Sequence, residues 1–182
     1  MSNNNYKIKG FTLIEMLVTA LIFSIVSGAI MGVFVSAIKL QRYSLVHQQL
    51  LNQVSYAMEY MDRAIRMAVK DDDGDCISAG QNYEVSNENR KIEFKNYKGE
   101  CQEFFWDIND NQLKVYKTDF GSSLFLTSDD FEVTSFNFQV FGDGMDNDQP
   151  RVTLSIDIKA KGSGQQPRIK IQTTVSQRNL DF

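Results

Sequence analysis

Residues 10–38, GFTLIEMLVTALIFSIVSGAIMGVFVSAI, are the most informative part of this sequence for its fold. It is almost wholly apolar and longer than the ~20 residues that a helix needs to cross the hydrocarbon core of a bilayer. A lone segment in lipid must satisfy its backbone hydrogen bonds internally, and a helix does so. The apolar part of a secretory signal peptide is shorter, at ~7 to 15 residues. The sequence therefore predicts a transmembrane helix over residues 11–38.

One acidic side chain, Glu15, lies inside this apolar stretch. A carboxylate at the centre of a bilayer costs ~2.5 to 3.5 kcal/mol on insertion scales, and less near the interface, where Glu15 would lie. The carboxylate is therefore expected to need a partner. The alternative is that its side chain reaches back to the lipid headgroups.

Residues 9–16, Lys-Gly-Phe-Thr-Leu-Ile-Glu-Met, resemble the processing motif of type IV prepilins and type II secretion pseudopilins. The resemblance rests on a basic leader, a glycine, an aromatic residue and the glutamate. It implies that prepilin peptidase removes the leader, residues 1–10, by cutting between Gly10 and Phe11, and that Phe11 is then N-methylated. Cutting there also frees an amine beside Glu15, so that the two charges can neutralise each other between neighbouring helices of a filament.

Small residues recur at every fourth position of the predicted span: Ser24, Gly28, Gly32 and Ser36. This spacing allows another helix to approach closely, as in GxxxG packing. The alternative is the ordinary use of glycine and serine in membrane helices. A contact with another pilin-type helix is the favoured interpretation.

After Ile38 the helical pattern becomes amphipathic, over residues 39–69. Its apolar residues recur at three- and four-residue steps: Leu50, Val54, Ala57, Met58, Met61, Ile65 and Ala68. Such a stripe is expected to pack against a folded domain while the opposite face stays in water. Because no proline interrupts residues 11–69, we expect one continuous helix.

Residues 70–182 are predicted to form an extracytoplasmic head rich in β-structure. Alternation of apolar and polar residues between turns predicts strands over residues 91–97, 103–108, 112–117, 131–141, 151–161 and 168–177. One buried and one wet face suit an antiparallel sheet that the amphipathic helix covers. The predicted fold class is therefore α+β and pilin-like: a long N-terminal helix packed on a C-terminal antiparallel β-sheet domain.

Aromatic residues are frequent in the head. Those that could build a ligand platform are Phe104, Phe105, Trp106, Phe120, Phe125 and Phe131. Packing in the core and on the sheet is the favoured interpretation of this group.

Cys76 and Cys101 have a spacing that fits no zinc motif. A disulfide is favoured if the head lies outside the cytoplasm, and two unpaired thiols are the alternative. Asp143, Asp146 and Asp148 are candidate calcium ligands in the loop GDGMDNDQP, because grouped carboxylates in glycine turns suit that cation. The run from Asp71 to Asp75 is a weaker candidate. Solvated turns are the favoured interpretation of both, since neither completes an EF-hand loop.

Charge and motifs exclude several function classes. The net charge is −4 and the basic residues form no run, which disfavours nucleic acid as a partner. There is no P-loop, GxSxG, HExxH or CxxC motif and no histidine beside a nucleophile, so an enzyme is disfavoured. No cofactor is expected apart from the candidate calcium.

The head is also similar to minor pseudopilins of the GspJ type, through residues 126–128, 133–138 and 173–179. This resemblance implies a minor subunit near the tip of a type II secretion or type IV pilus filament, where it primes assembly. Its expected partners are other pilins, prepilin peptidase, the assembly platform of the inner membrane and membrane lipid. A single span would anchor it there with the head periplasmic or extracellular. The alternatives are a major, self-polymerising pilin and a membrane-anchored module that binds a substrate or metal.

Overall fold

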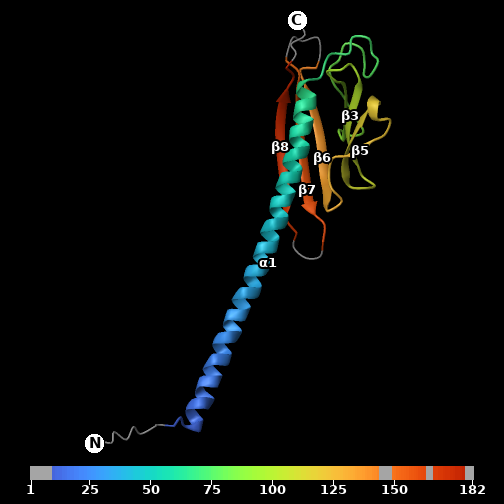
Figure 1. The fold of residues 1–182 in the computed structure, drawn as a ribbon. Coiled ribbons are helices and arrows are strands. Elements are labelled where there is room, and N and C mark those ends of the chain that lie inside the picture. Colours follow the sequence, from blue (N-terminus) through green and yellow to red (C-terminus); the bar gives the residue numbers. More distant parts are fainter. Residues whose placement is uncertain (1–9, 144–148, 163–165, 179–182) are drawn as a thin grey trace, which may run out of the picture. The chain divides into compact units, whose positions relative to one another are not determined.

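The computed structural model describes residues 10–143, 149–162 and 166–178, which contain one long helix followed by β-strands (Figure 1). The elements are α1 (Leu13–Arg66), β1 (Glu84–Ser86), β2 (Lys91–Lys95), β3 (Cys101–Asp107), β4 (Gln112–Lys117), the 3-10 helix η1 (Thr118–Phe120), β5 (Leu124–Phe125), β6 (Phe131–Phe141), β7 (Arg151–Ala160) and β8 (Arg168–Ser176). The chain divides into two compact units between Ser44 and Leu45. The first unit holds the N-terminal part of α1, and the second holds the rest of α1 with all described strands.

Helix α1 ends against residues from distant parts of the chain, which bond the carbonyl groups that a helix end leaves unpaired. The hydroxyl of Tyr83 donates to the Ile65 carbonyl oxygen at 2.7 Å. The backbone N–H of Arg178 donates to the Arg66 carbonyl oxygen at 2.9 Å. The Gln177 side-chain amide then donates to the Ala68 carbonyl oxygen at 3.0 Å. The C-terminal segment thus fixes where the helix stops.

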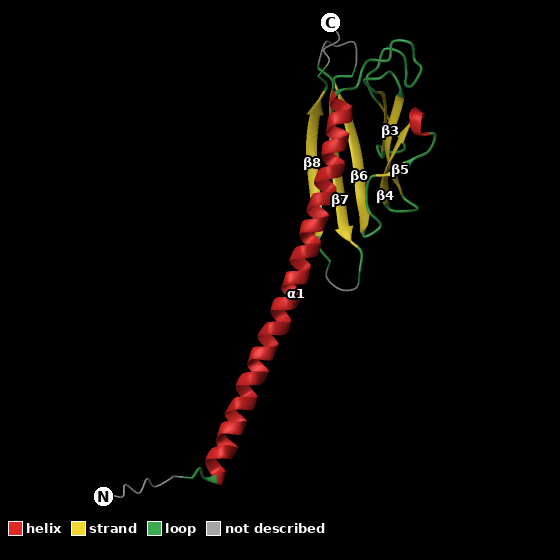
Figure 2. Cartoon of the chain, viewed as in Figure 1, coloured by secondary structure: helices red, strands yellow, loops and turns green. Residues whose placement is uncertain are grey.

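The strands form two antiparallel sheets where the sequence analysis expected one. The first is a meander in the order β1-β2-β3-β4-β5, and the second has the order β6-β7-β8 (Figure 2). Turns of the first sheet bond the outer edge of β6. The backbone N–H of Val133 donates to the Asn111 carbonyl oxygen and that of Phe138 donates to the Asn89 carbonyl oxygen, each at 2.8 Å.

The turn that supplies the Asn89 carbonyl has three consecutive residues with positive φ: Asn87, Glu88 and Asn89, at 54°, 57° and 65°. Asparagine tolerates the left-handed region better than most residues do. The two asparagines therefore suit this turn between β1 and β2.

A bulge in β6 changes which of its residues face the core. Its pairing with β7 shifts between Val133 and Ser135. Simple alternation would place Phe136 and Phe138 on the face opposite Val133, yet all three are buried. The extra residue of a bulge brings both runs to one face.

One hydrophobic core joins the second half of α1 to both sheets. The stripe expected from the sequence is confirmed, because all of its residues are buried: Leu50, Val54, Ala57, Met58, Met61, Ile65 and Ala68. Full burial of a side chain such as Leu50 contributes about 1.5 to 3 kcal/mol. The sheets supply Phe94, Phe104 and Phe138, none of which is exposed.

The expected core packing of the aromatic residues is only partly confirmed. Phe104 and Phe131 are buried, and Phe105 and Trp106 are half-buried. Phe120 and Phe125 are 46% and 59% exposed, so the prediction is wrong for them. Both lie at or beside β5, a strand of two residues at the edge of its sheet, where little of the chain can cover them.

Candidate functional site: the N-terminal segment of helix α1

Helix α1 begins with a capping box formed by Thr12 and Glu15. The backbone N–H and the hydroxyl of Thr12 both donate to Oε2 of Glu15, each at 3.0 Å, and the backbone N–H of Glu15 donates to the Thr12 hydroxyl at 3.4 Å. The Met16 N–H donates to the Thr12 carbonyl oxygen at 3.3 Å and closes the first turn. This reciprocal arrangement satisfies donors that a helix start leaves unpaired.

The capping box gives Glu15 a partner within its own chain, which the sequence analysis missed. The signal was present, because Thr-x-x-Glu before an apolar run is the pattern of this cap. All hydrogen bonds of the Glu15 side chain with the described part of the chain go to Oε2. Its second oxygen is left for a donor from elsewhere.

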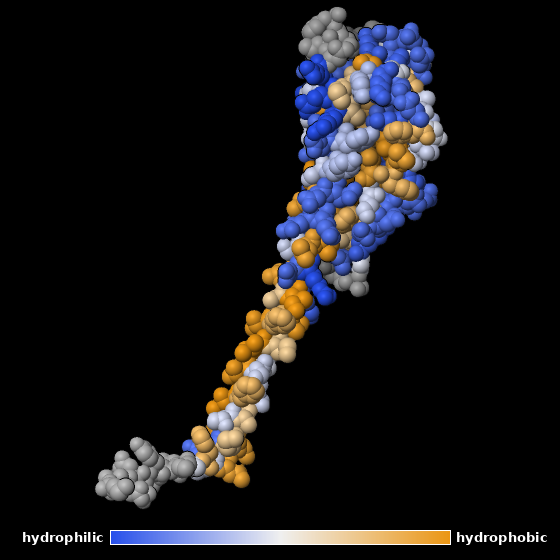
Figure 3. Space-filling model, viewed as in Figure 1, coloured by the Kyte–Doolittle hydropathy of each residue, from blue (hydrophilic) through white to orange (hydrophobic). Residues whose placement is uncertain are grey.

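The apolar side chains that follow the capping box are exposed and are not packed against other described residues of the chain. Residues 10–45 are exposed, and Leu13, Phe23 and Val33 are 82%, 73% and 71% exposed. Figure 3 shows this part as a mostly hydrophobic surface. By length and composition α1 can cross a membrane. Apolar surface of this extent marks contact with lipid or with other proteins.

Two of the four small residues of this segment bond their own helix, and the two glycines have open space beside them in the part of the chain that the structure describes. The hydroxyls of Ser24 and Ser36 donate to the carbonyl oxygens of Ala20 and Gly32, at 2.8 and 2.9 Å. A methyl group at Gly28 or Gly32 would meet no atom of the chain within 4 Å. Glycine in a helix costs roughly 0.5 to 1 kcal/mol relative to alanine. Packing within the chain therefore gives no reason for the two glycines.

After α1, a loop is organised around the buried carboxylate of Asp71. Its Oδ2 accepts from the backbone N–H groups of Cys76 and Ile77 at 2.7 and 3.0 Å, and its Oδ1 accepts from Lys95 Nζ at 3.0 Å. Burial by itself would raise the pKa of Asp71, but these three hydrogen bonds hold it well below its usual range. Because Asp71 is fully buried and bonded in this way, it acts as the centre of the loop.

The same loop carries the two cysteines. The structure joins Cys76 and Cys101 in a disulfide, which links the loop to the start of β3. Lys95 also lies 3.5 Å from Asp75, so the ammonium group bridges the loop and β2. The acidic run 71–75 therefore serves packing and ion pairing within the chain.

The candidate calcium ligands are only partly described, since Asp146 and Asp148 lie outside the described residues. Asp143 accepts three hydrogen bonds: from the backbone and side-chain amides of Asn82 at 2.8 and 3.1 Å, and from the backbone N–H of Tyr83 at 3.0 Å. Its carboxylate thus ties the β6–β7 loop to the segment before β1. Among residues 10–143, 149–162 and 166–178, no group of three or more His, Cys, Asp or Glu side chains could hold a metal.

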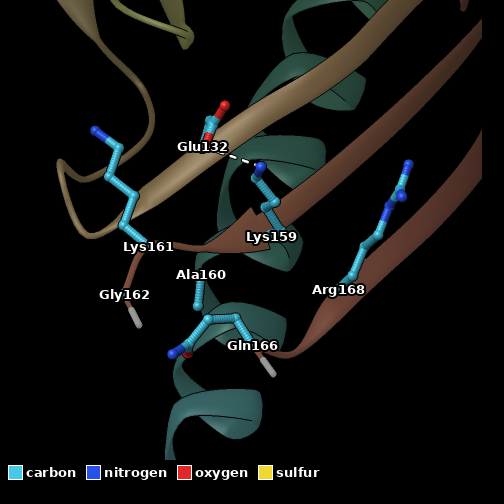
Figure 4. Close-up of a pocket in the computed structure, with 7 residues that line it drawn as sticks. All are labelled: Glu132, Lys159, Ala160, Lys161, Gly162, Gln166 and Arg168. Carbon is cyan, nitrogen blue, oxygen red and sulfur yellow. Dashed lines mark ion pairs between the residues drawn. The ribbon is translucent and has the colours of Figure 1, made fainter. Parts of the chain in front are cut away.

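A pocket of about 310 Å³ lies where β7 turns towards β8 (Figure 4). Lys159 forms an ion pair with Glu132 at 3.2 Å across the strands. Arg168 binds both oxygens of Asp157 at 2.6 Å and thereby lowers the pKa of that carboxyl group. The side chains that line the pocket include no nucleophile with a base beside it.

A comparison with protein families finds a match in the N-terminal part of the chain. Residues 5–36 match the family model of the prokaryotic N-terminal methylation motif. A comparison with curated proteins and another with solved structures gave no match. The match includes Gly10, Phe11 and Glu15 together with all four small residues.

The methylation motif lies at the start of a long apolar helix that is followed by an α+β head, and this is the organisation of a prepilin-like chain. The motif implies processing by prepilin peptidase and assembly with other pilins. Together with the apolar helix it is consistent with anchoring in the inner membrane before assembly.

Proposed function

We propose that this chain is a minor pseudopilin or pilin-like subunit that primes assembly near the tip of a type II secretion or type IV pilus filament. Prepilin peptidase cuts between Gly10 and Phe11, Phe11 is N-methylated, and residues 11–38 hold the subunit in the inner membrane until it enters the filament. The observation that carries the proposal is the methylation motif at residues 5–36, on a helix whose later residues form part of the head core.

Glu15 is the residue that selects a neighbour in this proposal. Its Oε2 is engaged by Thr12, which fixes the side chain at the first turn of α1. Its Oε1 remains available to the amine of Phe11 on an adjacent helix after cleavage. In lipid an unpaired charge is costly, so a helix inserted at the wrong height would leave both charges without a partner. The pair therefore favours one register between helices.

The glycines support close packing of α1 with other helices. Gly28 and Gly32 cost helix stability and serve no contact with the other described residues. Between membrane helices, small residues at this spacing let two backbones approach. The hydroxyl groups of Ser24 and Ser36 bond their own helix, so these two donors are paired within the chain.

The narrower assignment to the GspJ type rests on the resemblance of the head segments. One of these, residues 173–179, contains Gln177 and Arg178, which cap the end of α1. Its sequence therefore has a structural role in joining the helix to the head. A minor position is expected to give few copies per filament, whereas a major pilin would dominate purified filaments. Quantitative mass spectrometry of sheared filaments distinguishes the two.

The processing step is tested by expressing the full chain with an active or an inactive prepilin peptidase and measuring the mass of its N-terminal peptide. With the active enzyme the peptide is expected to begin at N-methylated Phe11, and with the inactive enzyme at the leader. A chain that keeps residues 1–10 in the presence of active peptidase would refute the proposal.

The role of Glu15 is tested in the same cells. Glu15→Gln keeps the hydrogen-bonding shape of the side chain but removes its charge, so the variant should be processed normally and yet enter filaments poorly. Glu15→Asp serves as the control that keeps a carboxylate. Unchanged incorporation of Glu15→Gln would count against the charge-pairing role.

A further inference from the structure

One side of the head has an apolar surface that its own chain leaves open. We name it the lateral aromatic patch and define it as Tyr56, Tyr60, Lys117, Phe120 and Leu124. Tyr56 is 63% exposed, and Phe120 and Leu124 are each 46% exposed. Figure 3 shows a hydrophobic area over the β4–β5 edge.

The members of the patch come from four elements: α1, β4, η1 and β5. Lys117 Nζ, at the end of β4, lies 5.5 Å from the ring centre of Tyr60 on α1 and 5.3 Å from that of Phe120 on η1. Leu124 pairs with Val115 across β4 and β5, so it lies on the same face of the sheet as that buried residue. Lys117 thus links α1 to η1, and Leu124 lies on the same face of the sheet as Val115 and Lys117.

The core beneath the patch holds it in place. The ring of Tyr60 meets that of buried Phe104 edge to face, with centroids 5.9 Å apart. The side-chain amide of Gln53 donates to the Leu126 carbonyl oxygen at 2.9 Å and ties α1 to the end of β5. A surface fixed in this way loses little conformational entropy when it binds, which favours affinity.

Lys117, the charged residue of the patch, differs in its ion pairing from the other lysines of its sheet. Strands β2 and β4 carry four lysines, and three of them face carboxylates: Lys91 pairs with Glu93 and Glu103, Lys95 with Asp71 and Asp75, and Lys114 with Asp107 and Asp110. Within the described residues Lys117 forms no ion pair, and its ammonium group lies over the rings of Tyr60 and Phe120. Its ammonium group is therefore available to a carboxylate of another molecule.

Size and composition suit the centre of a protein interface. Exposed parts of four apolar side chains amount to an area on the order of 300 Å², the size at which an apolar patch on a monomer is often functional. Interface centres are enriched in aromatic residues, and a stable interface buries about 800 Å² on each partner. The patch would supply the apolar centre, with surrounding polar residues as the rim.

We propose that the lateral aromatic patch docks a neighbouring subunit of pilin type, different in sequence from this chain, through an apolar surface that carries a carboxylate for Lys117. A pilin-type neighbour is favoured because Tyr56 and Tyr60 lie on α1, the helix whose methylation motif implies assembly with other pilins. A neighbour of different sequence follows from the proposed minor position, on which this inference rests.

Photocrosslinking of the full chain in its host cells tests the proposal. A benzophenone analogue of phenylalanine replaces Phe120 in the patch, Phe141 as an equally exposed position outside it, or Phe23 in the membrane segment. The expected result is an adduct of the Phe120 variant with a different pilin-type subunit, identified by mass spectrometry, at several times the yield from Phe141.

Charge variants provide the second arm. Lys117→Glu should reduce the Phe120 adduct at least about tenfold, because a like charge facing a carboxylate costs more than the 1.4 kcal/mol that corresponds to that factor. Lys117→Arg should retain the adduct. Lys98→Glu makes the same charge change at an exposed turn and should have no effect. Equal unfolding temperatures of the variants exclude a folding defect.

The outcomes separate this inference from the proposed function. If Phe23 yields adducts with pilin-type subunits while Phe120 yields none, only a self-adduct, or only a protein of another class, the docking proposal is overturned and the assembly role stands. Equal yields from Phe120 and Phe141 would also overturn it, since they would report crowding. If Phe23 yields no pilin-type adduct either, the proposed function fails with it.

Discussion

Replacing Asp71 with asparagine is expected to destabilise the head by about 2 to 3 kcal/mol at neutral pH. The carboxylate is fully buried and accepts hydrogen bonds from Cys76, Ile77 and Lys95. An asparagine oxygen can still accept from the two backbone N–H groups, but these bonds lose their charge-assisted strength. The amide nitrogen would then face the Lys95 ammonium group. Breaking a buried ion pair usually costs 3 to 5 kcal/mol. We expect the lower loss of about 2 to 3 kcal/mol because Lys95 still has the Asp75 carboxylate nearby in the variant.

The pH dependence of this loss has a definite sign. The folded-state pKa of Asp71 lies well below that of the unfolded chain, which is about 3.9. The stability that Asp71 contributes is therefore complete above about pH 4 and is lost as the pH falls through the folded-state value. The wild-type chain should weaken below pH 4, and Asp71→Asn should weaken less over that range. The difference between the two proteins should shrink as the pH falls.

The measurement is guanidinium unfolding of the full chain in detergent micelles, with the disulfide intact, at several pH values between 2 and 7. Asp72→Asn is the matched control, because the Asp72 side chain is 76% exposed and its pair with Lys70 is long, at 3.8 Å. This control should change stability by less than about 0.5 kcal/mol. A wild-type stability for Asp71→Asn at pH 7, or a difference that does not change with pH, would refute the reasoning.

Three further predictions concern the head. Replacing Cys76 and Cys101 together with serine should cost about 3.5 kcal/mol in guanidinium unfolding, because the disulfide closes a loop with a separation of 25 residues; a loss below about 1 kcal/mol would contradict this. Phe104→Ala should cost about 3 to 5 kcal/mol in the same assay, since the ring is fully buried, whereas Phe141→Ala should be nearly neutral. If Asp143, Asp146 and Asp148 bind calcium, millimolar Ca²⁺ should give a calorimetric heat that Asp143→Asn removes. Absence of both the heat and any stabilisation by Ca²⁺ would dismiss the calcium site.

The periodic elements could be predicted from sequence because their signals are local. The buried stripe of α1 was found residue by residue, and β4 and β6 have the predicted bounds. The predicted helix, residues 11–69, is longer than Leu13–Arg66 by a few residues at its ends. The missed strands, β1 and β5, have three and two residues, too few to show an alternation.

Contacts between distant segments could not be predicted in this way. Alternation shows which face of a strand is buried but does not identify its neighbours, so the division into two sheets was missed. The bulge at Val133 and Ser135 was missed because it breaks the alternation itself. The buried carboxylate of Asp71, in the loop after α1, is paired with Lys95 of the distant strand β2. The capping box of Thr12 and Glu15, in contrast, was readable from four adjacent residues.

The apolar residues of α1 are distributed differently in its two parts, and this difference explains how one helix can have two roles. Up to Ile38 the helix is apolar all round, which suits lipid or a bundle of helices and offers no particular face to one sheet. From Leu50 onward one apolar stripe of the helix is buried in the head core, while Leu51 and Tyr56 on its other sides remain exposed. Tyr83, Gln177 and Arg178 then bond the last carbonyl groups, so the head holds this part through polar bonds as well. Assembly contacts can therefore form along the first part of α1 without competing for the residues that keep the head folded.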